Sequence, residues 1–283
     1  MQLVLSLFTG VGLLDKAFRE AGFCVVSAGD IIYGQDIRDF TGMKNKFDGI
    51  IGGSPCQDFS TLKRERGTYS LKMLYEYIRI VQECEPDWYL LENVRGVPNV
   101  IDLPCKNVTV PGVKNKCDST GVTLLRDKYT HQRFDINQSW YDDFSRLRHI
   151  QFGSKNGLYL DIPRGVPNQN LKGGCALASD DRTFKELCKI QGLDKDFNLP
   201  DFTVKGKKKL VGNGVPLSIG RVLANEVKRV TARAKNKCDA PGVTLQLKIC
   251  ACGCGRSLTG KKKTYDATCR KRLSRKNKCD YAA

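Results

Sequence analysis

The chain opens with a strand, a glycine turn and a helix, and this order constrains the fold more than any other feature. Residues 3–8 are apolar and β-like, residues 9–12 (Thr-Gly-Val-Gly) form the turn, and residues 13–21 have helical apolar spacing. Further apolar strands are predicted over 23–28 and 47–51. Strands that alternate with helices indicate an α/β fold with a parallel sheet.

More elements of both kinds are predicted along the rest of the chain. Helices are expected over 71–81, 182–192 and 217–230, and strands over 88–91 and 144–153. Residues 205–209 are expected to form a basic loop and 211–216 a tight turn, whereas 99–131 and 154–181 show little periodicity. The α/β alternation therefore continues, with two segments that the pattern leaves open.

Residues 52–60 (Gly-Gly-Ser-Pro-Cys-Gln-Asp-Phe-Ser) place a cysteine just beyond the strand predicted over 47–51. Glycine and proline end that strand, so Cys56 falls in a loop at the carboxyl edge of the sheet. Ligands bind at this edge in open α/β sheets, and a partly exposed thiol there can be reactive. The alternative is a buried cysteine that only packs in the turn.

Three carboxylates are expected at this same edge of the predicted sheet. Asp30 lies just past the strand over 23–28, where it can bind the hydroxyls of a ribose or cap a turn. Asp36 lies in a further turn at this edge, where it can accept from an adenine amino group or cap that turn. Glu92 closes the strand over 88–91, where burial is costly unless the carboxylate is used or paired in a salt bridge.

Two arginines, Arg146 and Arg148, lie two residues apart in the strand predicted over 144–153. Residues i and i+2 of a strand share a face, so both guanidinium groups are expected to point into one cleft. The alternative is a solvated basic face of the strand. His131 and His149 have no cysteine or carboxylate at a triad-like spacing, and no role is assigned to them.

A strong positive charge restricts the partners of this chain. The 283 residues carry a formal net charge of +17, with basic runs at 205–209, 261–263 and 270–272. Such an excess of positive charge indicates a polyanionic partner, with nucleic acid as the first candidate. The alternative is that the charge only keeps the protein in solution, but that role does not require basic residues to be clustered in runs. No apolar stretch approaches the length of a membrane span, and residues 1–8 resemble a first strand rather than a signal peptide. We therefore expect a cytoplasmic protein with no membrane partner.

The cysteines indicate a reducing compartment. There are 13 of them, an odd number, so reduced thiols, metal ligands or a catalytic thiol are expected rather than a disulfide framework. Four lie in a basic tail after residue 231 and are candidate ligands of a structural zinc ion: Cys250, Cys252, Cys254 and Cys269. The usual Cys-x-x-Cys pairs are absent, so a disordered basic tail is an equally good interpretation.

These motifs, in this order, resemble the DNA cytosine-5 methyltransferase family over residues 3–230. The similar segments are Phe8-Thr9-Gly10-Val11-Gly12, Pro55-Cys56-Gln57, Glu92-Asn93-Val94, Arg146-Leu147-Arg148 and Gly212-Asn213-Gly214-Val215-Pro216. The sequence departs from the family at Leu13, where a second glycine is usual, and at Phe144, where a glutamine is usual. The short region before the helix at 182–192 is similar to compact phage-like or prophage-like members.

The resemblance implies a Rossmann-like, S-adenosylmethionine-dependent methyltransferase fold with a small target-recognition region and a basic C-terminal tail. Residues 1–153 would form the first part of the catalytic domain and 154–204 the target-recognition region. Residues 205–232 would return to complete the catalytic domain, and 233–283 would be the tail. The host would be a bacterial or phage-infected cell.

The resemblance also implies the roles of single residues in methyl transfer to C5 of a flipped cytosine. Cys56 would add covalently to the base, Glu92 would protonate or hydrogen-bond N3, and Arg148, aided by Arg146, would hold O2. Residues expected to line the S-adenosylmethionine site are Phe8, Gly10, Gly12, Asp30, Asp36, Ile37 and Asn213.

The implied partner is double-stranded DNA, bound by a monomer, and a cognate restriction enzyme would be a further partner. A tRNA cytosine-5 methyltransferase with the same residues is the first alternative, and a catalytically silent nucleic-acid-binding protein is the second. A nicotinamide-dependent oxidoreductase is less favoured, because the glycine turn lacks the third glycine of the dinucleotide fingerprint: position 15 is Asp.

Overall fold

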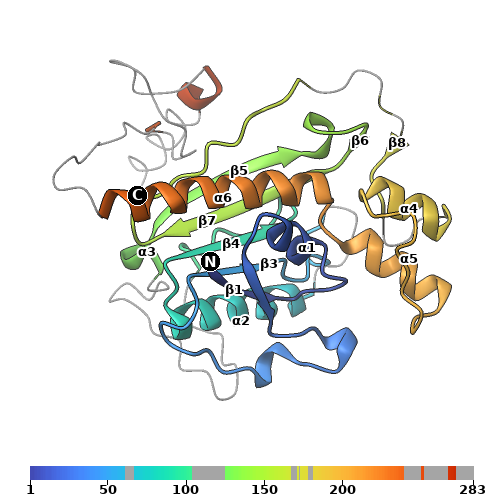
Figure 1. Cartoon of the computed structure of the whole chain (residues 1–283), viewed down its shortest axis with the longest axis horizontal. Coiled ribbons are helices and arrows are strands. Elements are labelled where there is room, and N and C mark those ends of the chain that lie inside the picture. Colours follow the sequence, from blue (N-terminus) through green and yellow to red (C-terminus); the bar gives the residue numbers. More distant parts are fainter. Residues whose placement is uncertain are drawn as a thin grey trace.

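A six-stranded mixed sheet forms the centre of the computed structural model, which describes residues 1–60, 67–103, 125–166, 171, 173–177, 181–238, 250–251 and 267–271 (Figure 1). The strands are β1 (Leu3–Leu7), β2 (Cys24–Ser27), β3 (Gly49–Gly52), β4 (Trp88–Asn93), β5 (Thr130–Asn137) and β7 (Leu147–Ser154). Two further short strands, β6 (Phe144–Ser145) and β8 (Gly173–Gly174), pair separately. The helices are α1 (Leu13–Glu20), α2 (Tyr69–Cys84), α3 (Leu125–Lys128), α4 (Phe184–Ile190), α5 (Val204–Asn213) and α6 (Leu217–Cys238).

The strand order β2-β1-β3-β4-β7-β5 determines where a ligand can bind. Strands β1 to β4 are parallel, and β7 runs antiparallel to both β4 and β5. The chain goes from β1 outward to β2 and then crosses to β3 on the other side of β1. Such a reversal of strand order opens a crevice at the carboxyl ends of the strands, here those of β1 and β3.

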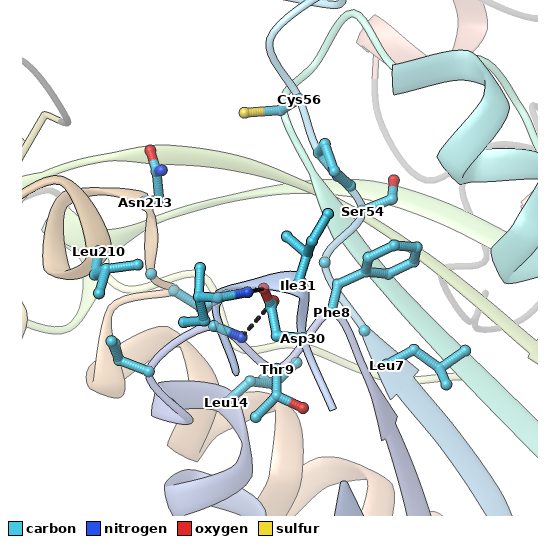
Figure 2. A pocket seen from close by; sticks show the side chains of 18 of the residues that line it. Leu7, Phe8, Thr9, Leu14, Asp30, Ile31, Ser54, Cys56, Leu210 and Asn213 are labelled. Carbon is cyan, nitrogen blue, oxygen red and sulfur yellow. Dashed lines mark hydrogen bonds between the residues drawn. The ribbon is translucent and has the colours of Figure 1, made fainter. Parts of the chain in front are cut away.

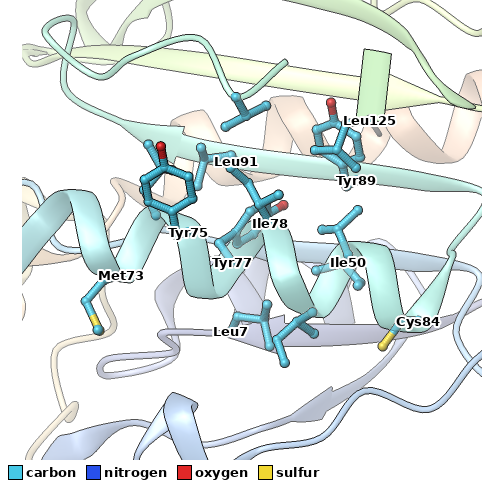
Figure 3. Packing of buried hydrophobic residues seen from close by; sticks show 14 of the residues in the cluster. Leu7, Ile50, Met73, Tyr75, Tyr77, Ile78, Cys84, Tyr89, Leu91 and Leu125 are labelled. Atoms are coloured by element: carbon cyan, nitrogen blue, oxygen red, sulfur yellow. The ribbon is translucent and has the colours of Figure 1, made fainter. Parts of the chain in front are cut away.

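Helices cover both faces of the sheet. On one face α2 buries Leu74, Tyr77, Ile78 and Val81, an i, i+3, i+4, i+7 pattern, against side chains that include Ile50 and Leu91 (Figure 3). On the other face α1 and α6 lie side by side over Trp88 and Phe152. They approach so closely that a Cβ on Gly220 would lie 2.9 Å from the Cβ of Ala17.

A third apolar cluster attaches α4 and α5 to the edge of this sandwich. Leu187 and Ile190 of α4 and Val211 of α5 pack with Leu13 and Ala17 of α1. The start of α4 is fixed by a capping box, in which Thr183 and Glu186 each bond the backbone of the other. Helices α4 and α5 therefore pack against α1, close to the glycine turn, rather than against the sheet.

Most of the predicted elements are confirmed, with five differences. One is that residues 211–213 of the tight turn predicted over 211–216 lie in helix α5. The basic residues 205–209, predicted as a loop, lie in helix α5, which starts at the N-cap Thr203. The strand predicted over 144–153 is interrupted at Arg146, between β6 and β7. Strand β5 was not predicted, and α6 runs to Cys238, past the predicted boundary at residue 232. Among the described residues, no helix is both long and apolar enough to cross a membrane.

Replacing Gly49 with alanine is expected to lower the free energy of unfolding by about 2–3 kcal/mol, because the added carbon overpacks the core. A Cβ at Gly49 would lie 2.1 Å from Cζ2 of Trp88, whose side chain is 1% exposed. Urea denaturation would measure the change. The matched control is Gly174→Ala, where a Cβ would meet no atom within 4 Å; equal stability of the two variants would contradict the prediction.

Candidate active site

A cavity of about 480 Å³ opens at the carboxyl ends of β1, β3 and β4 and is bounded on its other side by residues of α5 (Figure 2). Cys56, Glu92 and Arg148, which come from three separate parts of the sequence, all line it. So do most of the predicted cofactor residues: Phe8, Gly10, Asp30, Asp36, Ile37 and Asn213. Gly12 and Arg146 are not among the lining residues.

The turn after β1 has left-handed backbone at three positions. Phe8 has φ 54°, Gly10 has φ 55°, and Gly12 has φ 75° and begins α1 without a side-chain cap. A Cβ at Gly10 or Gly12 would meet nothing within 4 Å, so backbone conformation, not crowding, calls for glycine there. Phe8 adopts the same region with a bulky side chain, a strain of the kind that concentrates at functional sites.

Asp30 connects the end of β2 to this turn. Its Oδ1 accepts from Ile32 N at 3.1 Å, and its Oδ2 accepts from Gly10 N at 2.9 Å (Figure 2). The predicted capping interaction is therefore present. A carboxylate oxygen has two lone pairs, so the group can still accept from ligand hydroxyls in the cavity.

Asp36 caps the short 3₁₀ turn η2 (Ile37–Asp39). Its Oδ1 accepts from both Arg38 N and Arg38 Nε at 2.9 Å. These bonds lower the pKa of Asp36 to about 2, so the carboxylate is ionised and can only accept hydrogen bonds. The side chain of Ile37 beside it is buried and contributes an apolar surface to the cavity.

The loop that carries Cys56 is fixed at both ends. On one side Asn93 Nδ2 donates to Ser54 O at 2.9 Å and to Ser54 Oγ at 3.0 Å. On the other side Asp58 Oδ2 accepts from Ser70 N at 2.8 Å, and Ser70 Oγ accepts from Asp58 N at 3.1 Å, which ties the loop to the start of α2. Neither Asn93 nor Asp58 was assigned this role from the sequence, although both lie within the quoted motifs.

The surroundings of Cys56 favour the protonated form of its thiol. Burial raises its pKa, and the charge of Glu92 raises it further, whereas Arg148 and Arg146 lower it. Only the thiolate is a good nucleophile. The two arginines therefore favour the reactive form, as does a backbone hydrogen bond to the thiolate.

Glu92 and Arg148 form a buried ion pair. The distance from Arg148 Nε to Glu92 Oε1 is 2.7 Å, and the side chains are 14% and 9% exposed. The antiparallel register places Glu92 opposite Ile150, so Arg148, two residues along β7, shares its face. Burial raises the pKa of Glu92, an effect that Arg148 and then Arg146 offset.

The side chain of Arg146 is directed elsewhere. Its Nη1 donates to Ala176 O, and its Nη2 donates to Gly212 O at 2.8 Å. The break between β6 and β7 interrupts the strand alternation, so the expected common cleft receives Arg148 but not Arg146.

Two of the four predicted zinc ligands can be placed. Cys250 and Cys269 are buried, with exposed fractions of 3% and 0%, whereas Cys252 and Cys254 lie outside the described residues. Within the described part of the chain, no group of three or more His, Cys, Asp or Glu side chains could hold a metal ion. The zinc site stays a prediction.

The model of the family "C-5 cytosine-specific DNA methylase" matches residues 3–121. The type II methyltransferase M.FnuDI of Fusobacterium nucleatum is 38% identical over 112 residues, with 33% of this chain and 33% of that protein covered. The type II methyltransferase M.HgiGI of Herpetosiphon aurantiacus is 30% identical over 111 residues, with 32% of this chain and 88% of that protein covered. The chain thus spans a third of M.FnuDI and most of M.HgiGI.

A crystal structure described as a DNA modification methyltransferase encoded within an E. coli prophage has a similar fold. Its TM-score is 0.57 at 16% sequence identity, and the match covers 82% of this chain and 100% of that chain. The sheet order and this likeness show a Rossmann-like methyltransferase fold. Because the match to M.HgiGI extends over nearly all of that protein and the family model covers the β1 turn, Cys56 and Glu92, this chain belongs to the C-5 cytosine-specific DNA methylase family.

Proposed function

We propose that this protein transfers a methyl group from S-adenosylmethionine to C5 of a cytosine that is flipped out of double-stranded DNA. One observation carries the proposal: Cys56, Glu92 and Arg148 share a single cavity with the glycine turn and Asn213. A nucleic-acid-binding protein without activity has no need of a thiol, an acid and a cation at one point. The family membership of the chain supports the same reaction.

The cavity has the properties that S-adenosylmethionine requires. Its volume of about 480 Å³ lies within the usual range for small-molecule sites. The backbone at Gly10 is open to close approach, Asp30 and Asp36 offer acceptors for hydroxyl and amino groups, and Ile37 offers an apolar surface. When bound there, the donor supplies an electrophilic methyl group on a sulfonium.

The side chains of the cavity would act on the cytosine as follows. The Cys56 thiolate forms a bond from Sγ to C6, while Glu92 donates a proton or hydrogen bond to N3 and Arg148 binds O2. The electron pair that develops at C5 then attacks the methyl group, and the bond from that methyl to the sulfonium sulfur breaks. Loss of the C5 proton to a base expels Cys56 Sγ, N3 returns to Glu92 any proton that it accepted, and the aromatic ring is restored.

The substrate requires a flipped base, because C6 is not accessible to a thiol inside a stacked duplex. The net charge of +17 supplies attraction for phosphates. Lys209 of α5 lines the cavity, and Lys205 and Lys208 belong to the same helix, so we assign this helix to the DNA side. We assign residues 154–204 to target recognition, as the family resemblance implies.

The test uses purified protein with methyl-labelled donor and, in separate reactions, unmethylated duplex DNA and tRNA. Label is expected at C5 of cytosine in DNA only. Label in tRNA alone would favour the first alternative, and label in neither, with DNA still bound, would favour a silent binding protein. Sedimentation and metal analysis of the same preparation test the proposed monomer and the zinc ion of the tail.

Gly53 is expected to be required for activity but not for stability. A Cβ at Gly53 would lie 2.9 Å from Glu92 Oε2, and Glu92 cannot easily move because Arg148 binds its other oxygen. We expect Gly53→Ala to reduce kcat about 10- to 100-fold, since small misplacements of a reacting group have effects of this size. Thermal unfolding should be close to that of the parent protein; a variant with unchanged kcat would contradict this placement of Glu92.

A further inference from the structure

Arg146 is a buried cation whose hydrogen-bond partners are backbone carbonyl groups. It is 4% exposed, and its two terminal nitrogens donate to Ala176 O and Gly212 O. Its Nε has no hydrogen-bond partner among the described residues. Burial, then the charge of Arg148, lower the pKa of Arg146 to about 9, so the side chain remains a cation at neutral pH.

Gly212 belongs to a segment that a second buried side chain also holds. Gln191, which is 0% exposed, donates from Nε2 to Val211 O at 2.6 Å and to Gly214 O at 3.0 Å. Together with Arg146, it binds the carbonyl groups of three of the four residues from 211 to 214, and the fourth, Asn213, lines the cavity. We call residues 211–214 the return segment.

The return segment is also pressed against the first helix. A Cβ on Gly214 would lie 2.0 Å from Cδ1 of Leu13, so the backbone is in close contact with the start of α1. A small shift of the return segment therefore moves Asn213 relative to the glycine turn. The bonds from Arg146 and Gln191 determine this position.

The charge of Arg146 also reaches the reactive end of the cavity. Its electrostatic partners include Glu92 and Cys56, and it favours the ionised form of each. The ion pair of Arg148 with Glu92 already uses that arginine, whereas no ion pair of Arg146 is found among the described residues. Arg146 is thus a cation that carbonyl groups, rather than a carboxylate, hold in place, and its charge acts on the Cys56 thiol.

We propose that Arg146 is a positioning residue that joins the two halves of the site: it holds the return segment and Ala176 by their carbonyl groups and keeps a positive charge beside Cys56 and Glu92. This inference rests on the proposed function for the identity of the donor. It replaces the expectation that Arg146 helps Arg148 to bind the base. Only a planar group with several donors can bond two carbonyls from different segments at once.

The test separates geometry from charge with three variants and a control. Arg146→Met removes both properties, Arg146→Lys keeps the charge but not the two-carbonyl contact, and Gln191→Leu weakens the hold on the return segment without altering charge. The control is Arg182→Met, since Arg182 donates to Gly174 O and Cys175 O, which lie in the same stretch as Ala176 and outside the return segment.

Donor binding is measured by calorimetry with S-adenosylmethionine and no DNA. We expect Kd to rise about tenfold or more in Arg146→Met and Gln191→Leu, and less in Arg146→Lys, because buried carbonyl groups lose their donors. The control should stay within about twofold of the parent protein. Parent-like affinity in both Arg146→Met and Gln191→Leu would overturn the positioning role.

The charge is measured by the pH dependence of alkylation at Cys56, read by mass spectrometry of the Cys56 peptide. We expect the midpoint to move upward by about 0.5–1 pH unit in Arg146→Met and to stay in place in Arg146→Lys and Gln191→Leu. A purely structural role of Arg146 would not produce this difference in midpoint between Arg146→Met and the other two variants. An unchanged midpoint in Arg146→Met would overturn the electrostatic part.

Neither readout needs DNA, so the two proposals can fail separately. A parent protein that binds the donor but methylates no DNA would overturn the proposed function and leave the role of Arg146 standing. If the parent protein does not bind the donor, or Arg146→Met does not fold, amide hydrogen exchange over residues 211–216 in Arg146→Lys and Gln191→Leu decides. Faster exchange than in Arg182→Met supports the role, and equal exchange overturns it.

Discussion

Replacing Cys56 with serine is expected to reduce methyl transfer by at least about 10⁴-fold, as removal of a covalent nucleophile does in other enzymes. The serine hydroxyl has almost the size of the thiol but a far higher pKa, so it cannot add to C6 at neutral pH. The loop geometry should be kept, because Asn93 and Asp58 hold it through Ser54 and Ser70 rather than through the sulfur. Labelled methyl transfer and DNA binding are measured side by side, and DNA binding should be retained.

A second cysteine provides the control for this experiment. Cys24 on β2 is half-buried and does not line the cavity, so Cys24→Ser should keep the parent rate. Duplex DNA with 5-fluorocytosine sharpens the test, because fluorine cannot leave C5 as a proton and the adduct with Cys56 should persist. Methyl transfer by Cys56→Ser at the parent rate would remove this residue from the mechanism.

Replacing Arg148 with methionine is the second large effect we expect. Loss of a group that stabilises developing charge should lower kcat by about 10²- to 10³-fold. It also leaves Glu92 without its partner, and breaking a buried ion pair in this way costs about 3–5 kcal/mol of stability. Initial rates and urea denaturation at neutral pH measure both losses.

The loss of stability should depend on pH with a definite sign. Burial raises the pKa of Glu92 in the folded state even in the presence of Arg148, and removal of Arg148 takes away an influence that lowers it. A carboxyl group with a raised folded pKa favours folding below its unfolded pKa, and this contribution is lost as pH rises through the folded pKa. Arg148→Met should therefore be closest in stability to the parent protein at acidic pH.

The double variant Arg148→Met with Glu92→Gln distinguishes pairing from catalysis. Removing the uncompensated charge should restore much of the stability, whereas kcat should remain low because neither the acid nor the cation is present. A double variant as unstable as Arg148→Met would contradict the ion pair as the source of the loss. Recovery of kcat would contradict the catalytic roles of both residues.

The convergence of Cys56 and Glu92 could be predicted from the sequence because each follows a recognisable apolar strand. The carboxyl ends of neighbouring parallel strands must meet at one edge, and the register from β1 to β4 does bring them there. Arg148 was reached by alternation within its strand. The same alternation also placed Arg146 in the cleft, and this prediction is wrong, because the interruption between β6 and β7 cannot be recognised in an apolar pattern that continues through it.

Strand β5 and helix α5 could not be predicted, because they depend on tertiary contacts that no sequence pattern indicates. Strand β5 carries charged residues such as Arg133 and Asp135 at the sheet edge, so its apolar alternation is weak. Pairing with β7 places Asp135 opposite His149, and the two side chains bond at 2.8 Å although 14 residues separate them. Helix α5 was not predicted because its run of lysines shows no apolar periodicity. The helix is stabilised instead by the cap at Thr203 and by the burial of Val211 against α1.

The close pairing of α1 with α6 has a consequence for how the protein folds during its synthesis on the ribosome. Phe18 and Trp88 share an apolar cluster with Leu223 and Val227, and Arg221 binds Glu20 across 201 residues of sequence. Until residues 217–230 have been synthesised, α1 alone covers that side of the nascent sheet, so apolar side chains there stay exposed to chaperones and proteases. Ribosome-bound chains that end before Leu217 should be degraded rapidly, whereas chains that include Val230 should acquire protease resistance in a single late step.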